Sequence, residues 1–131
     1  MRYKDVTQQI IGAAFTVHKQ LGGGFLEKVY ENALGLELRQ TGLLVQQQFP
    51  IPVFYGNEPV GDYYADLLIE RSVICEIKAA VSLAKEHELQ LVNYLCATGF
   101  ETGLLINFGK SVAVRRKFKT YRNPVNSEKS C

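Results

Sequence analysis

The stretch Tyr63–Ala79, YYADLLIERSVICEIKA, decides the fold. Two runs that suit a pleated surface, Tyr63–Ile69 and Val73–Ala79, flank a short polar segment, and this pattern predicts a β-hairpin. Side chains two positions apart in a strand point to the same face of a sheet. We expect the odd-numbered face, which is almost entirely apolar, to face the core: Ala65, Leu67, Ile69, Val73, Cys75 and Ile77.

Three charged side chains, Asp66, Glu76 and Lys78, share the even-numbered face. If the hairpin loop has three residues, Asp66 lies directly opposite Glu76, close enough for both carboxylates to share one ion. A two-residue loop would instead place Asp66 opposite Cys75. The hypothesis of a shared ion therefore depends on the loop length.

Paired carboxylates repel each other, and a hard divalent cation such as Mg²⁺ relieves this repulsion while keeping several waters. The backbone carbonyl of Ile77 could add an oxygen ligand. Lys78 could orient an attacking water or offset charge on a phosphate. The structural alternative for Asp66, Glu76 and Lys78 is a cross-strand salt-bridge cluster.

The chain on the N-terminal side of the hairpin predicts two helices. Apolar residues recur at helical spacing from Val6 to Leu21 and again from about Leu26 to Gln40, with Gly42 as the stop of the second helix. Gly22-Gly23-Gly24 lacks the preceding strand and the Gly-Lys-Ser/Thr ending of a phosphate loop, so we interpret it as a helix C-cap and hinge.

The remaining segments complete a mixed sheet. Leu43–Tyr55 is predicted to be extended, Leu83–Thr98 helical, and Thr102–Asn107 and Val112–Phe118 strands. The order ααβββαββ predicts an α/β fold, a mixed β-sheet flanked by helices. We expect one domain over residues 1–120 and a disordered tail over 121–131.

Two helix faces carry further candidate site residues. Glu27, followed by Tyr30 and Glu31, could complete a metal site, although an acid in the first turn of a helix commonly compensates the helix dipole. On the later helix, a polar stripe could hold a phosphate or a water near the hairpin, although a single histidine is more often structural. The stripe consists of His87, Gln90 and Tyr94.

The charge distribution favours a nucleic-acid partner only weakly. The net charge is +2, but basic residues gather near the end of the chain and could contact phosphates or simply solvate a tail. The three cysteines are widely spaced, which argues against a zinc knuckle or an iron–sulfur cluster. With no apolar run of about 20 residues and no signal peptide, we expect a cytoplasmic protein that does not enter a membrane. The basic residues are Lys110, Arg115, Arg116, Lys117, Lys119, Arg122 and Lys129.

These motifs resemble the PD-(D/E)xK, or restriction-endonuclease-like, nuclease superfamily, which pairs an Asp on one strand with Glu-x-Lys on the next. Gly24–Tyr30, GFLEKVY, is similar to the signature of its GxxExxY family, and Gln90–Tyr94 to the QxxxY motif of its exonuclease branch. The superfamily name has proline where this chain has Ala65.

The resemblance implies Mg²⁺ or Mn²⁺ held by Asp66 and Glu76 with help from Glu27, and Lys78 as the catalytic lysine. It implies supporting contacts from Gln90 and Tyr94.

Our first functional hypothesis is metal-dependent hydrolysis of phosphodiester bonds, with DNA favoured over RNA and the strand held by basic residues. The second is a non-catalytic binding or regulatory subunit with the same fold. A third is a nuclease that acts as a homodimer or with a partner protein, since one small domain has a limited footprint on a duplex. The basic residues proposed to hold the strand are Arg115, Arg116, Lys117 and Lys119.

Overall fold

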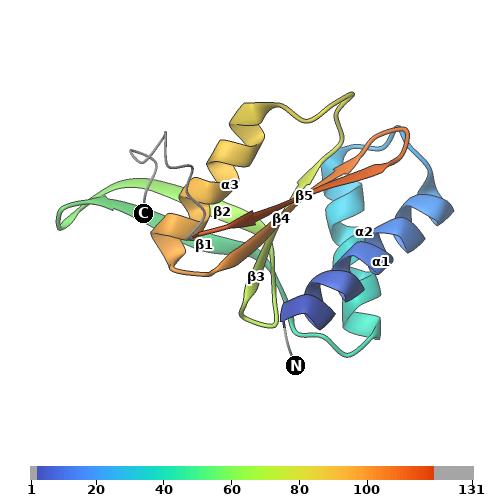
Figure 1. Ribbon diagram of the computed structural model, residues 1–131, viewed down its shortest axis with the longest axis horizontal. Coiled ribbons are helices and arrows are strands. Elements are labelled where there is room, and N and C mark those ends of the chain that lie inside the picture. The colour runs from blue at the N-terminus through green and yellow to red at the C-terminus, as the bar shows by residue number, and fades with distance from the viewer. Residues whose placement is uncertain (1–2, 120–131) are drawn as a thin grey trace.

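The computed structural model describes residues 3–119 and has the predicted element order. Figure 1 shows a sheet with helices on both sides. No helix among the described residues is long and apolar enough to cross a membrane. The elements are α1 (Tyr3–Leu21), α2 (Glu27–Gln40), β1 (Val45–Tyr55), β2 (Glu58–Ile69), β3 (Val73–Lys78), α3 (Lys85–Thr98), β4 (Thr102–Phe108) and β5 (Val112–Phe118).

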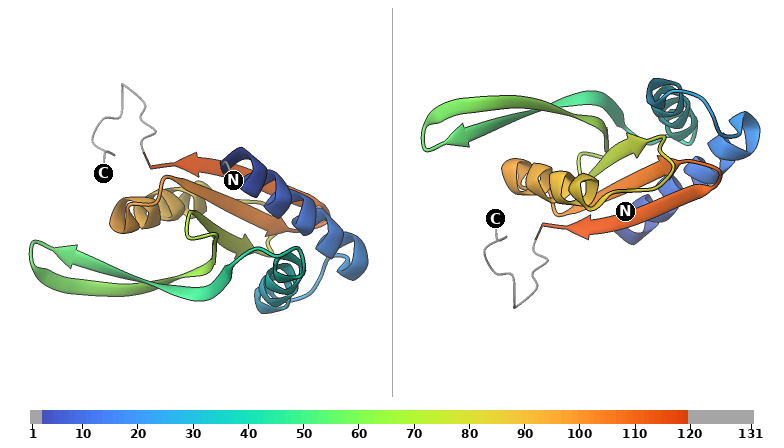
Figure 2. Two further views of the ribbon diagram at one scale, coloured as in Figure 1. Left: turned by 90° about the horizontal axis from the view of Figure 1, so that it is seen from below. Right: turned by 90° about the horizontal axis from the view of Figure 1, so that it is seen from above.

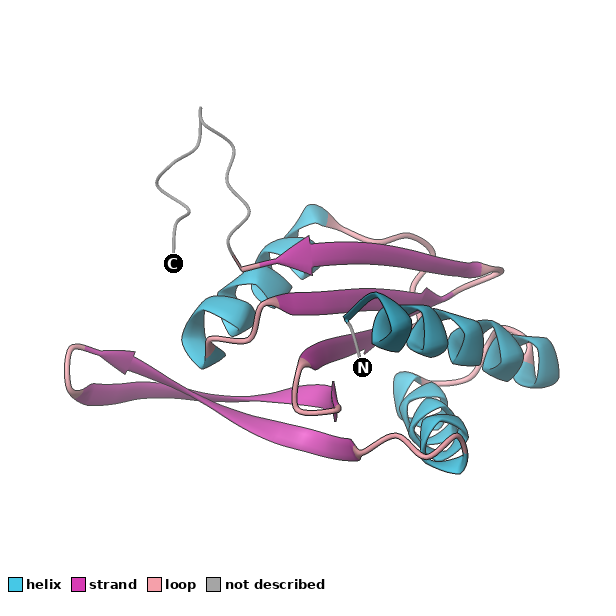
Figure 3. Cartoon of the chain, turned by 60° about the horizontal axis from the view of Figure 1, so that its bottom comes forward, coloured by secondary structure: helices cyan, strands magenta, loops and turns pink. Residues whose placement is uncertain are grey.

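The five strands lie in the sheet in chain order, β1-β2-β3-β4-β5. β3 and β4 are parallel and joined through α3, whereas the other neighbours are antiparallel. A crossover helix between parallel strands must lie over one face of the sheet. α3 therefore covers one face, and α1 and α2 cover the other, as Figures 2 and 3 show.

Two hydrophobic cores follow from this arrangement. The larger core packs α1 and α2 against the sheet and contains Leu67, Cys75 and Ile77. The smaller core lies under α3 and contains Leu68 and Ile74. β4, predicted from its continuous apolar run, is buried along its whole length because it lies between the two cores.

The prediction that one face of the hairpin is the core and the other carries charge is therefore wrong in part. Leu68 and Ile74 belong to the even-numbered set, yet α3 buries them. Ala65, which was expected beside Leu67, lies in the smaller core instead. Only the part of the even face beyond the reach of α3 is left to polar groups.

The distal parts of β1 and β2 form a two-stranded ribbon that extends away from the body of the molecule (Figures 1 and 2). We call it the arm, residues 49–65. β2 begins at Glu58, earlier than predicted, because the ribbon turns at Gly56-Asn57 and pairing resumes with Tyr55 opposite Glu58. Pro50 and Pro52 lie exposed in β1, which is an edge strand.

Candidate active site

The β2–β3 hairpin has the three-residue loop on which the shared-ion hypothesis depends. Ile69 pairs with Val73 and Leu67 with Cys75, so residues 70–72 form the loop, and the next position of this register sets Asp66 opposite Glu76. The backbone of Glu70 and Arg71 takes the left-handed conformation that this tight connection requires. The alternative register, with Asp66 opposite Cys75, is excluded.

Asp66 and Glu76 hold each other through the backbone. The Asp66 amide donates to Glu76 Oε2 at 2.9 Å, and the Ile77 amide donates to Asp66 Oδ2 at 2.8 Å. Each carboxylate therefore accepts a hydrogen bond from a backbone amide of the facing strand, which fixes its position. One oxygen of each group, Asp66 Oδ1 and Glu76 Oε1, has no backbone donor among these contacts.

Glu31 of α2 is a third carboxylate in the same cluster. Only 4% of Glu31 is exposed, and its side chain accepts hydrogen bonds from Lys28 Nζ at 3.2 Å, Gln47 Nε2 at 2.9 Å and Gln48 Nε2 at 3.1 Å. These hydrogen bonds offset the cost of burying a polar side chain. Sequence reasoning noted Glu31 beside Glu27 but did not select it.

Gln48 links Glu31 to the hairpin. Its Nε2 lies 3.2 Å from Glu31 Oε1 and 3.4 Å from Asp66 Oδ1. Its backbone has φ of 53°, in the left-handed region that residues with a Cβ rarely adopt. Val45 and Leu67 lie in the larger core, whereas Phe49 and Ala65 pack with the smaller one. The β1–β2 ribbon therefore passes from the larger core to the smaller core at Gln48 and Asp66. The kink in the ribbon at this point turns the side chains of both residues toward α2.

Burial and mutual repulsion raise the pKa values of Asp66 and Glu76. Burial, followed by the charge of Asp66, raises the pKa of Glu76 to about 8. Burial is also the largest cause that raises the pKa of Asp66, with the charge of Glu31 adding to it. Lys78 lies close enough for its charge to lower both pKa values in part. A cation at this position would relieve the repulsion.

The model of the PD-(D/E)XK nuclease superfamily matches residues 4–120 of the sequence. The chain belongs to the PD-(D/E)XK nuclease superfamily. The crystal structure of SSO0001 has a similar fold, with a TM-score of 0.51 and 20% sequence identity over 72% of this chain and 52% of that chain. The chain thus spans about half the length of SSO0001. No curated protein sequence matches it.

Members of the PD-(D/E)XK nuclease superfamily generally use divalent metals. Within residues 3–119, no group of three His, Cys, Asp or Glu side chains is arranged to hold a metal ion. Mg²⁺ needs fewer protein ligands than that, because it keeps several waters and is commonly bound by one or two carboxylates. The opposed, repelling carboxylates of Asp66 and Glu76 fit such a site by their donor chemistry.

In the GxxExxY-like segment of this PD-(D/E)XK domain, the tyrosine has a structural role. Tyr30 is buried, donates to the Gly22 carbonyl at 2.6 Å, accepts from the Phe25 amide and stacks on Phe108 at 4.6 Å. It anchors the loop before α2. Glu27 is exposed in the first turn of α2, and we find Glu31, one turn later, in the carboxylate cluster instead.

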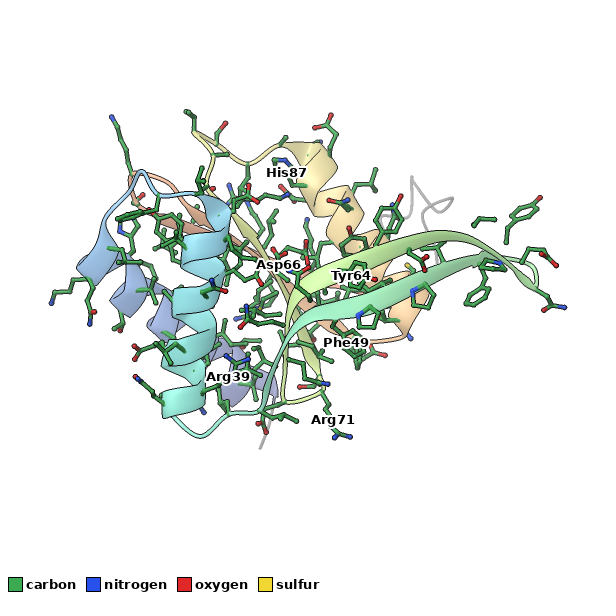
Figure 4. The ribbon with its side chains drawn as sticks, turned by 180° about the vertical axis from the view of Figure 1, so that it is seen from behind. Arg39, Phe49, Tyr64, Asp66, Arg71 and His87 are labelled. Atoms are coloured by element: carbon green, nitrogen blue, oxygen red, sulfur yellow. The ribbon has the colours of Figure 1, made fainter. Side chains whose placement is uncertain are left out.

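The polar stripe on α3 is divided between two roles. Gln90 and Tyr94 line a groove between α3 and the arm. His87 accepts a hydrogen bond from the Ala84 amide at its Nδ1, 3.2 Å, and so caps the first turn of the helix. Figure 4 shows His87 at this end of α3 and Asp66 where the arm joins the body. A supporting role for His87 stays a prediction.

The basic residues of β5 do not form one surface. Lys117 pairs with Glu88 at 2.6 Å on the α3 side, and Arg115 lies 3.9 Å from the same carboxylate. Arg116 points to the other face, where it donates to Thr7. Lys119 pairs with Glu101 at 3.5 Å. Arg122 and Lys129 lie outside the described residues.

Proposed function

We propose that this protein hydrolyses phosphodiester bonds in nucleic acid, with DNA the favoured substrate and Mg²⁺ or Mn²⁺ as cofactor. The observation that carries the proposal is the opposition of Asp66 and Glu76, each fixed by a backbone amide of the facing strand, with Lys78 on the same strand end. Membership of the nuclease superfamily makes hydrolysis the activity to expect from this geometry.

Asp66 and Glu76 would hold the metal, which when bound supplies a more acidic water and positive charge at the phosphate. Lys78 would offset charge that develops on the phosphate and help orient the attacking water. Glu31 would keep Gln48 in place and add negative charge close to the metal. The Ile77 carbonyl and Glu27 remain predicted ligands, of which Glu27 is the less well placed because it is exposed.

A second groove offers a path for the phosphate backbone. It has a volume of about 770 Å³ and is lined by Ala79, which follows Lys78, and by Lys110 and Arg115. No acidic side chain lines it among the described residues. Lys110 and Arg115 favour an anionic strand in this groove, although Arg115 also lies 3.9 Å from Glu88.

The alternative function is a non-catalytic nucleic-acid-binding or regulatory subunit of the same superfamily. The observation that favours it is the pairing of Lys117 and Lys119 with acids, which leaves fewer free cations for a substrate than the sequence indicates. The GxxExxY subfamily, a homodimer, a partner protein and a cytoplasmic location also remain predictions.

Calorimetric titration with Mg²⁺ and Mn²⁺, beside cleavage of labelled single-stranded, duplex and branched DNA, tests the proposal. Glu76→Gln and Asp66→Asn should lose metal binding and cleavage, whereas Lys78→Ala should lose cleavage and keep metal binding. Asp62→Asn, an exposed carboxylate on the same strand as Asp66, is the matched control and should behave as wild type. Metal binding without cleavage of any substrate would favour the non-catalytic alternative.

A further inference from the structure

The groove between α3 and the arm has a volume of about 710 Å³ and is not used by the chemistry proposed above. Arm residues 52–54 and Tyr63 form one wall, and α3 forms the other. Large apolar side chains in this groove are exposed to solvent, namely Phe54 at 57%, Tyr63 at 47% and Leu89 at 49%. Exposed aromatic groups gathered in one groove mark a binding surface.

The lining of the groove favours bases over phosphates. The groove is lined by aromatic rings and by the neutral amides of Gln90 and Asn93. Among the described residues, Glu86 is the one charged side chain that lines it. Phosphate attraction would require cations. Aromatic rings instead stack on the faces of bases, and amides can bond to base edges.

The groove lies near the carboxylate cluster, since Tyr63 in its wall is three residues from Asp66 on β2. The rings of Tyr63 and Tyr94 lie 5.6 Å apart, so the arm and α3 meet at this pair. Burial, the charge of Glu76, Tyr63 and the charge of Asp66 together raise the pKa of Tyr94 to about 12. The charges of both metal-binding candidates therefore act on Tyr94, which lines the groove.

We propose that this groove binds unpaired bases, so that the substrate is single-stranded nucleic acid or an unpaired end, with Tyr63 as the stacking platform. In a duplex, the faces of each base are covered by neighbouring pairs and cannot stack on a side chain. An open strand exposes them. The inference rests on the proposed nuclease function and names its substrate class.

The test measures binding without cleavage. Fluorescence anisotropy of wild-type protein in EDTA is recorded with labelled oligothymidylate of roughly 15 nucleotides, close to the upper site size of single-strand binding folds. The same length of duplex DNA and of oligouridylate are compared. We expect tighter binding to the single strands than to the duplex, and the two single strands distinguish DNA from RNA as the source of the bases.

Tyr63 and Tyr64 provide a matched pair of variants. Tyr64 is the adjacent residue of β2, is 55% exposed and does not line the groove (labelled in Figure 4). Tyr63→Ala should weaken single-strand binding roughly 5- to 150-fold, the loss that corresponds to one stacked base. Tyr63→Phe keeps the ring and should bind as wild type, as should Tyr64→Ala. Thermal unfolding verifies that each variant is folded.

Equal losses in Tyr63→Ala and Tyr64→Ala, or no loss in either, would overturn the groove proposal, as would equal affinity for duplex and single strand. Failure of the nuclease proposal looks different. If the protein binds single strands through Tyr63 but cleaves nothing with Mg²⁺ or Mn²⁺, the groove proposal stands and the nuclease proposal fails. If the Tyr63→Ala variant cleaves normally, the nuclease proposal stands and the groove proposal fails.

Discussion

Gln48 shows how one residue can connect a backbone conformation to the chemistry of a site. Its left-handed backbone lies at the point where β1 and β2 pass from the larger core to the smaller one. Its side-chain amide donates to the carboxylates of Glu31 and Asp66. A strained backbone that persists at such a point is a mark of function, since the surrounding structure must stabilise it. We therefore treat Gln48 as a positioning residue.

Two substitutions at Gln48 separate its backbone from its side chain. Gln48→Gly relieves the left-handed strain, so we expect it to be more stable than Gln48→Ala by about 1 kcal/mol in chemical denaturation. Both variants lack the amide that holds Glu31 and Asp66, so both should lose most cleavage activity. Full activity in Gln48→Gly would show that only the backbone conformation matters.

Glu76 makes the stability of the metal-free protein depend on pH. Its pKa lies at about 8 in the folded protein against an ordinary value of 4.5, so the folded state holds the proton more tightly than the unfolded state. The free energy of unfolding should therefore fall as pH rises from about 4.5 to about 8. At about 1.4 kcal/mol per pKa unit, the loss is on the order of a few kcal/mol.

Urea denaturation in EDTA at pH 5 and at pH 8.5 measures this loss. Glu76→Gln cannot ionise and should lose much less stability between the two pH values, with Asp66 accounting for the remainder. Mg²⁺ binding requires the deprotonated carboxylate, so wild-type affinity should rise over the same range. A wild-type protein that gains stability as pH rises would contradict the raised pKa.

At the scale of elements, the position of α3 depends on a glycine in β4. A Cβ added at Gly103 would lie 2.8 Å from Leu91 Cδ1, closer than side chains tolerate. The absent side chain lets α3 lie directly on the sheet, which sets the distance between Tyr94 and the carboxylates. The sequence alone shows a glycine in an apolar run, without its contact to a helix.

Gly103→Ala should therefore destabilise the protein by about 1–3 kcal/mol in urea denaturation, the cost of overpacking a core. Combining it with Leu91→Ala, which removes the clash, should cost less than the sum of the two single changes. Gly12→Ala is the control. A Cβ at Gly12, within α1, meets nothing within 4 Å and should stabilise the protein by about 1 kcal/mol.

The elements were predictable because each depends on local patterns. The hairpin itself followed from the alternation around Asp66 and Glu76, but its register did not, because the sequence left open whether the loop has two residues or three. The contribution of Glu31 was not predictable, since it depends on how α2 packs against the kinked ribbon. The signal that could have directed attention there is the amide run Gln46-Gln47-Gln48 in an otherwise apolar strand.

At the scale of the whole molecule, the candidate carboxylates come from three parts of the fold: Glu31 from α2, Asp66 from β2 at the base of the arm, where Figure 4 labels it, and Glu76 from β3. The two grooves have no lining residue in common and differ in chemistry. One is lined by aromatic groups and amides, and the other by Lys110 and Arg115 without acids. Under the two proposals, the first groove would bind bases and the second would bind phosphates.

The prolines of β1 have a consequence for how molecules behave in concentrated solution. A long edge strand with free amides is a template on which another chain can add a strand, and such addition leads to fibres. Pro50 and Pro52 have no amide hydrogen to offer at two positions of this edge. The two prolines therefore hinder strand pairing between the exposed arms of different molecules. Replacing both with threonine should shorten the lag before thioflavin-positive aggregates form.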